Sequence, residues 1–394
     1  MAAPGRVVEA TDGAYIVVGP SSIAVSRGEV EVFGVSVGPG ERLVIPIGRR
    51  VAVRVRGSIS VAGGEVLEAS REAFNALEDA ARRLAELEGR VVLVGPTDSG
   101  KSTLAAWASS ISGSYLLTVD VGQNEYYAPG FETLVKPPSS LPLIPGSSAE
   151  IRGNCFVGSF TPSGSIDRYL SCASMLAHKA PLASRLFVDS DGWVSGPGAL
   201  EAKLALLEAV GADHVVFIGD AGGLAQRLPS LLPSARVARL PRPPGLGSKS
   251  REERRLHRER LVALRLVGGR DVPVNASKVP VAGSPVFSCT EPSGGALELG
   301  QAPDLIYIEK CGDRTTAVFR RRPRGPLPRG VRVLVDGWER GLIAGIVDPL
   351  GGHHLALVTR VNYRSRVITV KTQYSGDLKG LILGKAKVNL SLGA

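Results

Sequence analysis

Residues 90–108 read RVVLVGPTDSGKSTLAAWA, and this stretch decides the fold. An apolar strand comes first, the pattern GxxxxGKS follows directly, and a helix-forming segment begins at its end. Loops of this kind wrap backbone N–H groups around phosphates. Further apolar runs at 115–119, 186–188 and 214–218 alternate with helical stretches such as 197–210. This alternation predicts a parallel sheet with helices on both faces.

Runs rich in Val and Ile on both sides of this region predict β structure. Residues 6–66 contain short alternating runs separated by turns, and the pattern returns after residue 285. Between them, apolar residues recur at helical spacing, which predicts an amphipathic helix: Leu67, Phe74, Leu77, Ala81, Leu84 and Leu87. The predicted fold class is α/β, with a central P-loop NTPase domain (67–284) flanked by all-β domains at 1–66 and 285–394.

Composition excludes several classes of protein. The chain has 394 residues, 44% of them hydrophobic, which is enough for two or three domains. Its 47 Lys and Arg exceed 37 Asp and Glu, and the resulting +10 favours polyanionic partners. No window approaches the roughly 20 apolar residues that span a bilayer, so we expect a soluble cytoplasmic protein without membrane contact.

The four cysteines are far apart in the sequence: Cys155, Cys172, Cys289 and Cys311. They form no CxxC pair, which argues against zinc ribbons, zinc fingers and thioredoxin-like motifs. We expect small buried side chains, with one structural disulfide as the alternative.

The phosphate-binding loop predicts a nucleotide site. Lys101 would reach the β- and γ-phosphates, and Ser102 would hold Mg²⁺. No NKxD-like element follows, which favours ATP over GTP. The predicted cofactor-binding residues are Gly95, Pro96, Thr97, Asp98, Ser99, Gly100, Lys101, Ser102 and Thr103.

Asp120 follows the second apolar run, in the segment LTVDVGQ (117–123). In a parallel sheet, the carboxyl end of that strand faces the nucleotide, so Asp120 could reach the metal or an attacking hydroxyl. The alternative is an exposed loop aspartate.

An arginine-rich segment at 248–260 predicts a helix with Arg251, Arg254, Arg255 and Arg258 at spacings of three and four. A solvated helix paired internally through Glu252, Glu253 and Glu259 is the alternative. P-loop kinases carry a mobile lid after the last core strand, and this position favours a lid (about 248–262) that stabilises transferred phosphate.

Trp193 lies in the glycine-rich segment DSDGWVSGPG (189–198). It could pack beneath the loop or provide a platform on which a nucleobase stacks.

These motifs together resemble the polynucleotide 5′-hydroxyl kinase family. GPTDSGKST, DVGQ, FVGSFTPSG, DSDGWVSGPG and SKSREERR occur in this order between two β regions, and the resemblance covers essentially the whole chain. The family includes the kinase subunit of the eukaryotic cleavage and polyadenylation factor, pre-rRNA-processing kinases and archaeal RNA kinases.

The resemblance implies roles for individual residues. Lys101, Ser102 and Thr103 match the Walker A motif, and Asp120 matches an aspartate that contacts metal and activates the 5′-hydroxyl. Gln123 and Thr161 would contact the acceptor, and Trp193 would stack on its terminal base. The resemblance implies that Arg254 and Arg258 are lid arginines, and Arg251 and Arg255 are further candidates for nucleic-acid contact.

Three positions depart from the family pattern. Thr118 stands where relatives often have an acid, and Phe160 stands where a hydroxyl residue can precede Thr-Pro. Lys249 falls at the first basic lid position, where a lysine cannot make the bidentate phosphate contact of arginine. These departures concern efficiency more than reaction type.

The sequence therefore predicts an ATP- and Mg²⁺-dependent kinase that phosphorylates 5′-hydroxyl ends of RNA, with DNA as a further candidate acceptor. An ATP-binding RNA-processing scaffold without turnover and a P-loop ATPase are the alternatives. The sequence identifies no protein partner.

Overall fold

The structure is a computed structural model that describes residues 7–138, 141–146, 149–243, 249–288, 304–312, 314–324 and 330–390. It is a mixed α/β protein with several sheets, as predicted. Contacts divide the chain into two compact units. The first contains residues 1–127, 131–154 and 161–257, and the second contains 128–130, 155–160 and 258–394. The division into three domains stays a prediction.

The first unit begins with a six-stranded sheet in the order β3-β2-β5-β1-β6, with β4 paired to β2. Val and Ile alternate between the buried and outer faces of its long strands, as β-branched residues do in half-buried strands. Leu67, expected in a helix, lies in the last strand opposite Ile16. The strands are β1 (Val7–Val18), β2 (Ser21–Val32), β3 (Val35–Val37), β4 (Arg42–Ile45), β5 (Arg50–Ala62) and β6 (Glu65–Glu68).

A seven-stranded sheet forms the centre of this unit, in the order β10-β9-β8-β11-β7-β12-β13. Its members are β7 (Arg90–Val94), β8 (Tyr115–Thr118), β9 (Phe131–Lys136), β10 (Glu150–Phe156), β11 (Leu186–Asp189), β12 (His214–Ile218) and β13 (Arg236–Leu240). The five strands β8, β11, β7, β12 and β13 are parallel, and β9 is antiparallel to β8. Four of the five parallel strands coincide with the predicted apolar runs.

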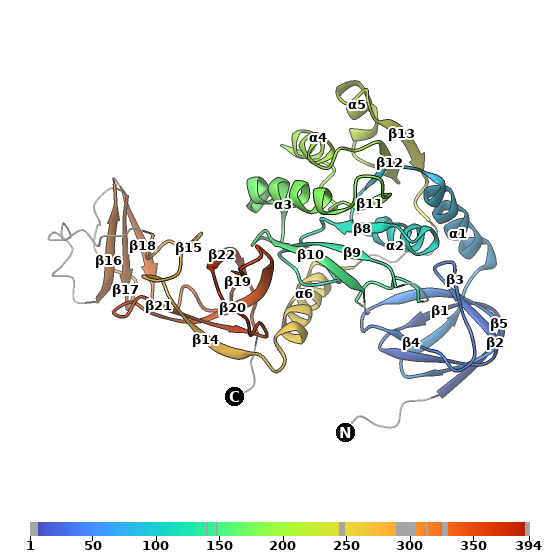
Figure 1. Ribbon diagram of the computed structural model, residues 1–394, viewed down its shortest axis with the longest axis horizontal. Helices are drawn as coiled ribbons and strands as arrows, with labels where there is room; N and C mark the ends of the chain where they lie inside the picture. The colour runs from blue at the N-terminus through green and yellow to red at the C-terminus, as the bar shows by residue number, and fades with distance from the viewer. Residues whose placement is uncertain are drawn as a thin grey trace. The chain divides into compact units, whose positions relative to one another are not determined.

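Helices cover both faces of the central sheet. The helices are α1 (Arg71–Glu86), α2 (Lys101–Ser112), α3 (Ile166–Lys179), α4 (Ala199–Val210) and α5 (Leu224–Leu231), with a short 3₁₀ turn, η1 (Pro162–Gly164). α2 connects β7 to β8 in one direction across the sheet, whereas α3, α4 and α5 connect strands in the other direction. Because such crossovers are right-handed, the two groups lie on opposite faces. Figure 1 shows α3 and α4 on one side and α1 and α2 toward the N-terminal strands.

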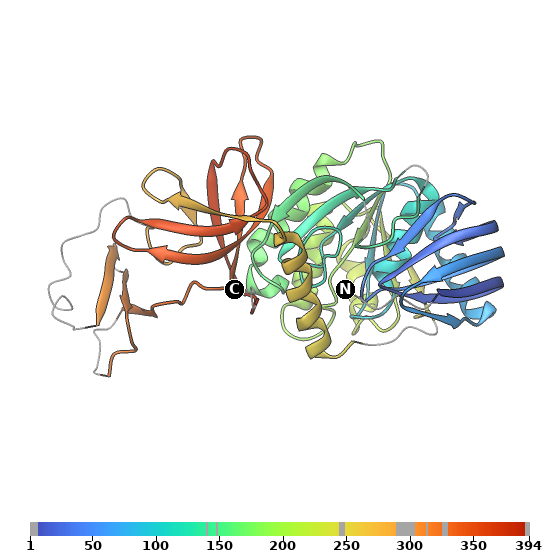
Figure 2. The same ribbon diagram turned by 90° about the horizontal axis from the view of Figure 1, so that it is seen from below.

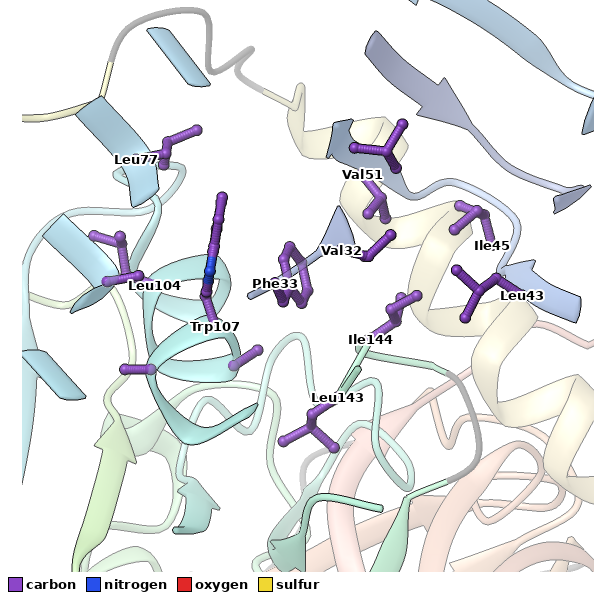
Figure 3. Packing of buried hydrophobic residues seen from close by; sticks show 14 of the residues in the cluster. Val32, Phe33, Leu43, Ile45, Val51, Leu77, Leu104, Trp107, Leu143 and Ile144 are labelled. Atoms are coloured by element: carbon purple, nitrogen blue, oxygen red, sulfur yellow. The ribbon is translucent and has the colours of Figure 1, made fainter. Parts of the chain in front are cut away.

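The N-terminal sheet packs directly on the helix that follows the phosphate-binding loop. Phe33 and Gly34, both with positive φ, form the two-residue turn between β2 and β3. The turn places the Phe33 ring 5.4 Å from that of Trp107 in α2, and Phe74 of α1 contacts the same indole edge-on at 5.5 Å. Figure 3 shows Phe33 between Trp107 and the β-sheet residues Val32, Leu43 and Ile45. One hydrophobic core therefore supports both sheets of this unit.

The second unit is mostly β. A six-stranded sheet has the order β14-β21-β20-β19-β22-β15, and a three-stranded sheet has the order β16-β17-β18. Its orange and red strands are seen in Figure 2. The strands are β14 (Arg270–Asn275), β15 (Val281–Ala282), β16 (Leu305–Cys311), β17 (Arg314–Phe319), β18 (Val331–Val335), β19 (Leu342–Val347), β20 (His353–Asn362), β21 (Val367–Thr372) and β22 (Gly380–Lys387). The C-terminal sheet thus begins at Arg270, before the predicted boundary at residue 285.

Small buried side chains were the expectation for the cysteines, with one structural disulfide as the alternative. Cys155, Cys172 and Cys311 are disulfide-bonded, and Cys289 lies outside the described residues. The separation of cysteines in the sequence carries no information about their separation in the fold, which is why spacing did not predict the disulfide bonds.

Among the described helices, none is both long and apolar enough to cross a bilayer.

Candidate functional site

The predicted phosphate-binding loop lies between β7 and α2. Gly100, at φ 94°, is the N-cap residue directly before α2. The first turn of the helix has no side-chain cap, so its backbone N–H groups are available to an anion. Asp98 also has a positive φ of 59°. A Cβ atom on Gly95 would lie 2.4 Å from the carbonyl oxygen of Ile218, so only glycine fits where the loop leaves the sheet. The local geometry is that of a phosphate-binding turn.

Lys101 is buried at the start of α2, with 5% of its surface exposed. Its Nζ donates hydrogen bonds to the carbonyl oxygens of Gly95 at 2.8 Å and Pro96 at 2.7 Å. Burial lowers the pKa of Lys101, while the charges of Asp189 and Asp120 raise it and offset part of the effect. The ammonium group thus faces two carboxylates at the carboxyl edge of the sheet.

Asp120 and Asp189 follow neighbouring parallel strands. β11 and β8 pair so that Asp189 lies opposite Thr118, and the N–H of Val119 donates to the Asp189 carbonyl at 3.0 Å. Asp120 Oδ1 accepts hydrogen bonds from the N–H groups of Gly122 at 3.0 Å and Gln123 at 3.1 Å. The adjacent strands therefore bring both carboxyl groups to the edge that carries the phosphate-binding loop.

Both carboxyl groups have raised pKa values. Burial, followed by the nearby charge of Asp191, raises the pKa of Asp120 against the opposing effect of Lys101. Burial raises the pKa of Asp189 to about 7, although Lys101 and a hydrogen bond from Ser102 lower it. Asp189 is 3% exposed. Carboxyl groups with pKa values displaced toward neutrality are typical of functional sites.

Asp189 was not among the predicted site residues. The sequence feature that could have identified Asp189 is an acidic residue at the end of the apolar run LFVD (186–189). This feature points to the site only when β11 is known to lie between β7 and β8. The neighbouring Asp191 forms a buried ion pair with Lys203 at 2.5 Å and accepts a hydrogen bond from the Tyr169 hydroxyl at 2.6 Å. Lys203, which lies 12 residues further along the chain in α4, was also missed.

A cavity of about 400 Å³ joins these groups. Residues 97–103, Asp120, Gln123 and Asp189 line it, together with Gly48, Arg49 and Arg50 from the N-terminal sheet. The N-terminal contribution was not predicted, because it depends on packing between distant segments. The described residues contain no cluster of three or more His, Cys, Asp or Glu suited to a metal ion.

Glu125 is a buried acid at the wall of this cavity. It forms an ion pair with Arg49, its Oε1 lies 2.9 Å from His257 Nε2, and Lys249 Nζ is 4.0 Å away. Burial raises the pKa of Glu125, but Arg49, His257 and Lys249 together bring it below its ordinary value. Glu125 thus connects the N-terminal sheet to the predicted lid.

Most of the predicted lid forms the first part of α6 (Arg251–Leu266). Asp98 Oδ2 accepts hydrogen bonds from Arg254 Nη1 at 2.9 Å and from the backbone N–H of Lys249 at 3.1 Å. Ser248 lies outside the described residues. Of the predicted basic residues, Lys249 and Arg254 are therefore close to the phosphate-binding loop.

The other lid arginines have different surroundings. Arg251 and Arg255 are exposed, and Arg255 Nε donates to Glu252 at 3.0 Å, as the solvated-helix alternative predicts. Arg258 belongs to the second unit, where its guanidinium lies 5.2 Å from the centre of the Phe160 ring.

Trp193 and Thr161 were predicted to contact the acceptor. Trp193 is half-buried, and its backbone N–H donates to Asp191 Oδ1 at 2.7 Å. A Cβ on Gly192 would lie 2.7 Å from the Thr97 nitrogen, so this loop packs tightly against the phosphate-binding loop. Thr161 is exposed, with its hydroxyl 3.3 Å from that of Ser163.

The chain is similar to several known proteins. Residues 95–264 match the family described as the mRNA cleavage and polyadenylation factor CLP1 P-loop. Polyribonucleotide 5′-hydroxyl-kinase Clp1 of Xenopus tropicalis is 29% identical over 294 residues, covering 67% of this chain and 65% of the Xenopus protein. The chain thus spans just under two thirds of that relative's length.

Two further proteins are similar over more of their length. Polyribonucleotide 5′-hydroxyl-kinase MJ1315 of Methanocaldococcus jannaschii is 24% identical over 337 residues, covering 80% of this chain and 90% of the archaeal protein. The solved structure of a wild-type Clp1p-Pcf11p (454–563) complex shares the fold, with a TM-score of 0.65 at 15% identity, covering 98% of this chain and 99% of that one. Residues 95–264 thus match the CLP1 P-loop domain, and the relatives to which the chain is similar include polyribonucleotide 5′-hydroxyl-kinases.

Proposed function

We propose that this chain is an ATP-dependent polynucleotide 5′-hydroxyl kinase that phosphorylates RNA ends, and DNA ends as a further acceptor, in RNA processing or repair. The observation that carries the proposal is the convergence of Lys101, Asp120 and Asp189 in one cavity beside the phosphate-binding loop. A P-loop domain between two all-β domains, and a cytoplasmic location, are parts of the same proposal.

The loop would bind the triphosphate of ATP. Residues 95–103 supply backbone N–H groups and the positive end of the α2 dipole. Lys101 would exchange its hydrogen bonds to the Gly95 and Pro96 carbonyls for the β- and γ-phosphate oxygens. Arg49 and Arg50, which line the same cavity, add positive charge on the side of the N-terminal sheet.

The donor set at the edge of the sheet fits Mg²⁺. Asp189 Oδ1 is buried and has no hydrogen-bond partner among the described residues, and the Ser102 hydroxyl bonds to the same carboxyl group. Mg²⁺ is bound by oxygen ligands, commonly one or two carboxylates together with substrate phosphates. Ser102, Asp120 and Asp189 would hold the ion, which when bound neutralises charge on the β- and γ-phosphates.

Asp120 would accept the proton of the acceptor. As the 5′-hydroxyl oxygen forms its bond to the γ-phosphorus, the bond to the β-γ bridging oxygen breaks and ADP leaves. The hydroxyl proton passes to the Asp120 carboxylate. A raised pKa suits this role, because a general base acts best when its pKa is near the working pH.

The lid would stabilise the transferred group. Arg254 already lies beside the phosphate-binding loop through Asp98, and Lys249 lies beside Glu125. Arg258 is proposed for the same task from the family resemblance alone. Preorganised cations near developing charge supply much of the catalysis in phosphoryl transfer.

The acceptor strand would approach over the DSDGW loop. Trp193 would stack on the terminal base. Its backbone N–H donates a hydrogen bond to Asp191, which fixes the backbone of the loop at this residue. Gln123 lines the cavity beside Asp120 and would orient the terminal nucleotide. Thr161, Arg251 and Arg255 are exposed and would contact the strand further along.

A transfer assay tests the proposal against its alternatives. The protein is incubated with γ-labelled ATP and Mg²⁺, and with a 5′-hydroxyl RNA oligonucleotide, the matching DNA, or no acceptor. Label on RNA supports the kinase. Label only in inorganic phosphate, at a rate independent of acceptor, would identify an ATPase, and tight ATP binding with neither product would identify a scaffold.

A further inference from the structure

The net positive charge of the chain comes from its C-terminal part. Residues 1–257 contain 26 Lys and Arg and 26 Asp and Glu, so they are formally neutral. Residues 258–394 contain 21 Lys and Arg against 11 Asp and Glu, which accounts for the entire net charge of +10. A basic surplus concentrated in one part of a protein is the electrostatic footprint of polyanion binding.

The second unit contains a pocket of about 580 Å³ with aromatic and basic walls. Ile306 and Tyr307 of β16 form one side, and the end of β20 with the following turn forms the other. Tyr363 lies in that turn, and Arg360 and Arg364 on either side of it are exposed. Aromatic faces beside arginines are the combination that binds single-stranded nucleic acid.

The aromatic side chains of the pocket are held in place. The rings of Tyr307 and Tyr363 stack with centroids 5.5 Å apart, and Phe287 contacts Tyr307 edge-on at 5.4 Å. Trp338 Nε1 donates to the Tyr363 hydroxyl at 3.0 Å, and the Tyr307 hydroxyl donates to Glu309. Tyr363 is 8% exposed and belongs to the core, whereas Tyr307 is half-buried. Tyr307 is therefore held in a fixed orientation and keeps part of its surface exposed at the pocket.

More arginines emerge at the same end of the strands. Leu305 pairs with Phe319, and the Arg320 N–H donates to the Asp304 carbonyl at 2.7 Å. The tract Arg320–Arg322 therefore begins beside Asp304, two residues before Ile306. Four acids lie nearby. Asp336 is exposed and Glu339 is buried, and the charges of both act on Tyr363. Glu309 is buried and accepts hydrogen bonds from the Phe287 N–H and the Tyr307 hydroxyl, and Asp304 is half-buried. Basic groups therefore predominate at the surface.

We propose that this pocket is a second binding site for single-stranded RNA, with a base stacked on Tyr307 and adjacent phosphates bound by Arg360 and Arg364. This site would bind nucleotides away from the 5′ end, whereas the 5′ end itself would bind at the cavity beside the phosphate-binding loop. The assignment to RNA rests on the proposed function, whereas the pocket and its charge do not. An acidic protein segment could form ion pairs with the arginines, but its carboxylate side chains would not stack on the aromatic ring.

The test is a binding measurement that involves no phosphate transfer. Fluorescence anisotropy of a labelled 20-nucleotide single-stranded RNA bearing a 5′-phosphate is measured with the full chain, without ATP or Mg²⁺. The variants are Tyr307→Leu, Tyr307→Phe and the double variant Arg360→Glu/Arg364→Glu. Lys379→Glu, an exposed cation of the same unit outside the pocket, is the matched control for charge.

The two kinds of variant have different expected effects. Tyr307→Leu should weaken binding by about fivefold to 100-fold, while Tyr307→Phe retains the ring and most of the affinity. The double variant should weaken binding and reduce the slope of log Kd against log salt by about 1.4, because two phosphate contacts are lost. Lys379→Glu should leave the slope nearly unchanged.

Three outcomes would overturn the proposal. They are equal affinities for wild type and all pocket variants, a loss for Lys379→Glu as large as for the double variant, or displacement of RNA by an acidic peptide equally from wild type and the Tyr307→Leu variant. Thermal melting of each variant separates lost binding from lost folding. RNA binding that depends on the pocket, without phosphate transfer, would refute the kinase and leave this site standing. Phosphate transfer by the wild type, together with pocket variants that bind RNA as tightly as the wild type, would support the kinase and refute this site.

Discussion

Arg254 of the lid donates a hydrogen bond to Asp98 of the phosphate-binding loop, with Nη1 and Oδ2 2.9 Å apart. The Lys249 backbone N–H donates to the same oxygen at 3.1 Å. A carboxylate of the loop therefore binds the arginine that our account assigns to the transferred phosphate. If Arg254 binds the transferred phosphate as proposed, ATP and Asp98 would compete for this cation.

Replacing Asp98 with Asn should tighten ATP binding by about two- to fivefold, because the change removes a negative charge beside the triphosphate and weakens a partly exposed ion pair. Asparagine tolerates the positive φ of this position, so the loop should keep its shape. Calorimetric titration with ATP gives the affinity. Asp167→Asn, an exposed aspartate of α3, is the control, and weaker ATP binding by Asp98→Asn would argue against competition.

Asp189 should make stability depend on pH. Its folded-state pKa of about 7 lies above the ordinary value of 3.8, so the folded protein holds a proton that the unfolded chain releases. The resulting stabilisation is present below about pH 4 and is lost as pH rises to about 7, by at most about 1.4 kcal/mol per pH unit. Urea unfolding of wild type and Asp189→Asn from pH 4 to 8 measures the difference. A difference that does not change with pH would contradict the raised pKa.

The affinity for Mg²⁺ should rise with pH, whereas the contribution of Asp189 to stability falls. A protonated Asp189 cannot bind Mg²⁺ as a carboxylate, so the Mg²⁺ concentration for half-maximal ATP-dependent activity should rise as pH falls below about 7. Activity measured over a Mg²⁺ series at each pH tests this. The Ser102→Ala variant should need more Mg²⁺ at every pH, with little change in the pH dependence itself.

The buried pair of Lys203 and Asp191 should be important for stability. Lys203→Met leaves the Asp191 carboxylate without its cation in a site where both residues are under 5% exposed, and should cost about 3–5 kcal/mol. Adding Asp191→Asn should recover part of the loss, as a double-mutant cycle in urea would show. Lys179→Met, at the exposed end of α3, is the control. Additive effects would mean that the pair does not interact as described.

Trp193→Ala should weaken acceptor binding by about fivefold to 100-fold and leave ATP affinity nearly unchanged. Trp193→Phe should restore most of the loss. KM for a 5′-hydroxyl RNA and the Kd for ATP are the two measurements. Equal losses in both would contradict a stacking role.

The sequence predicted the parts of the site that are local. The strand, loop and helix around Lys101 form one continuous segment, and Asp120 follows the next strand, so pattern and spacing were sufficient to find them. Asp189 was within reach, because an acid ends an apolar run, but its importance depends on β11 lying between β7 and β8. Strand order is not encoded in any single run.

Long-range pairings could not be predicted in the same way. Arg49 reaches Glu125 from the N-terminal sheet, and Phe33 reaches Trp107, through packing between segments separated by more than 70 residues. The predicted helix began too early because Leu67 fits a helical spacing, yet its strand pairs with β1 before Ser70 caps the helix. The helix predicted for the arginine row is present, but only tertiary contacts distinguish Arg254 from the exposed Arg251 and Arg255.

The most direct test measures phosphate transfer by wild type and Lys101→Ala. With γ-labelled ATP and a 5′-hydroxyl RNA, the account predicts one labelled 5′-phosphate end for each ADP formed by wild type, and a loss of at least about 100-fold in the variant. Melting curves establish that both are folded. ADP formation without labelled RNA ends, or transfer by Lys101→Ala at the wild-type rate, would contradict the account.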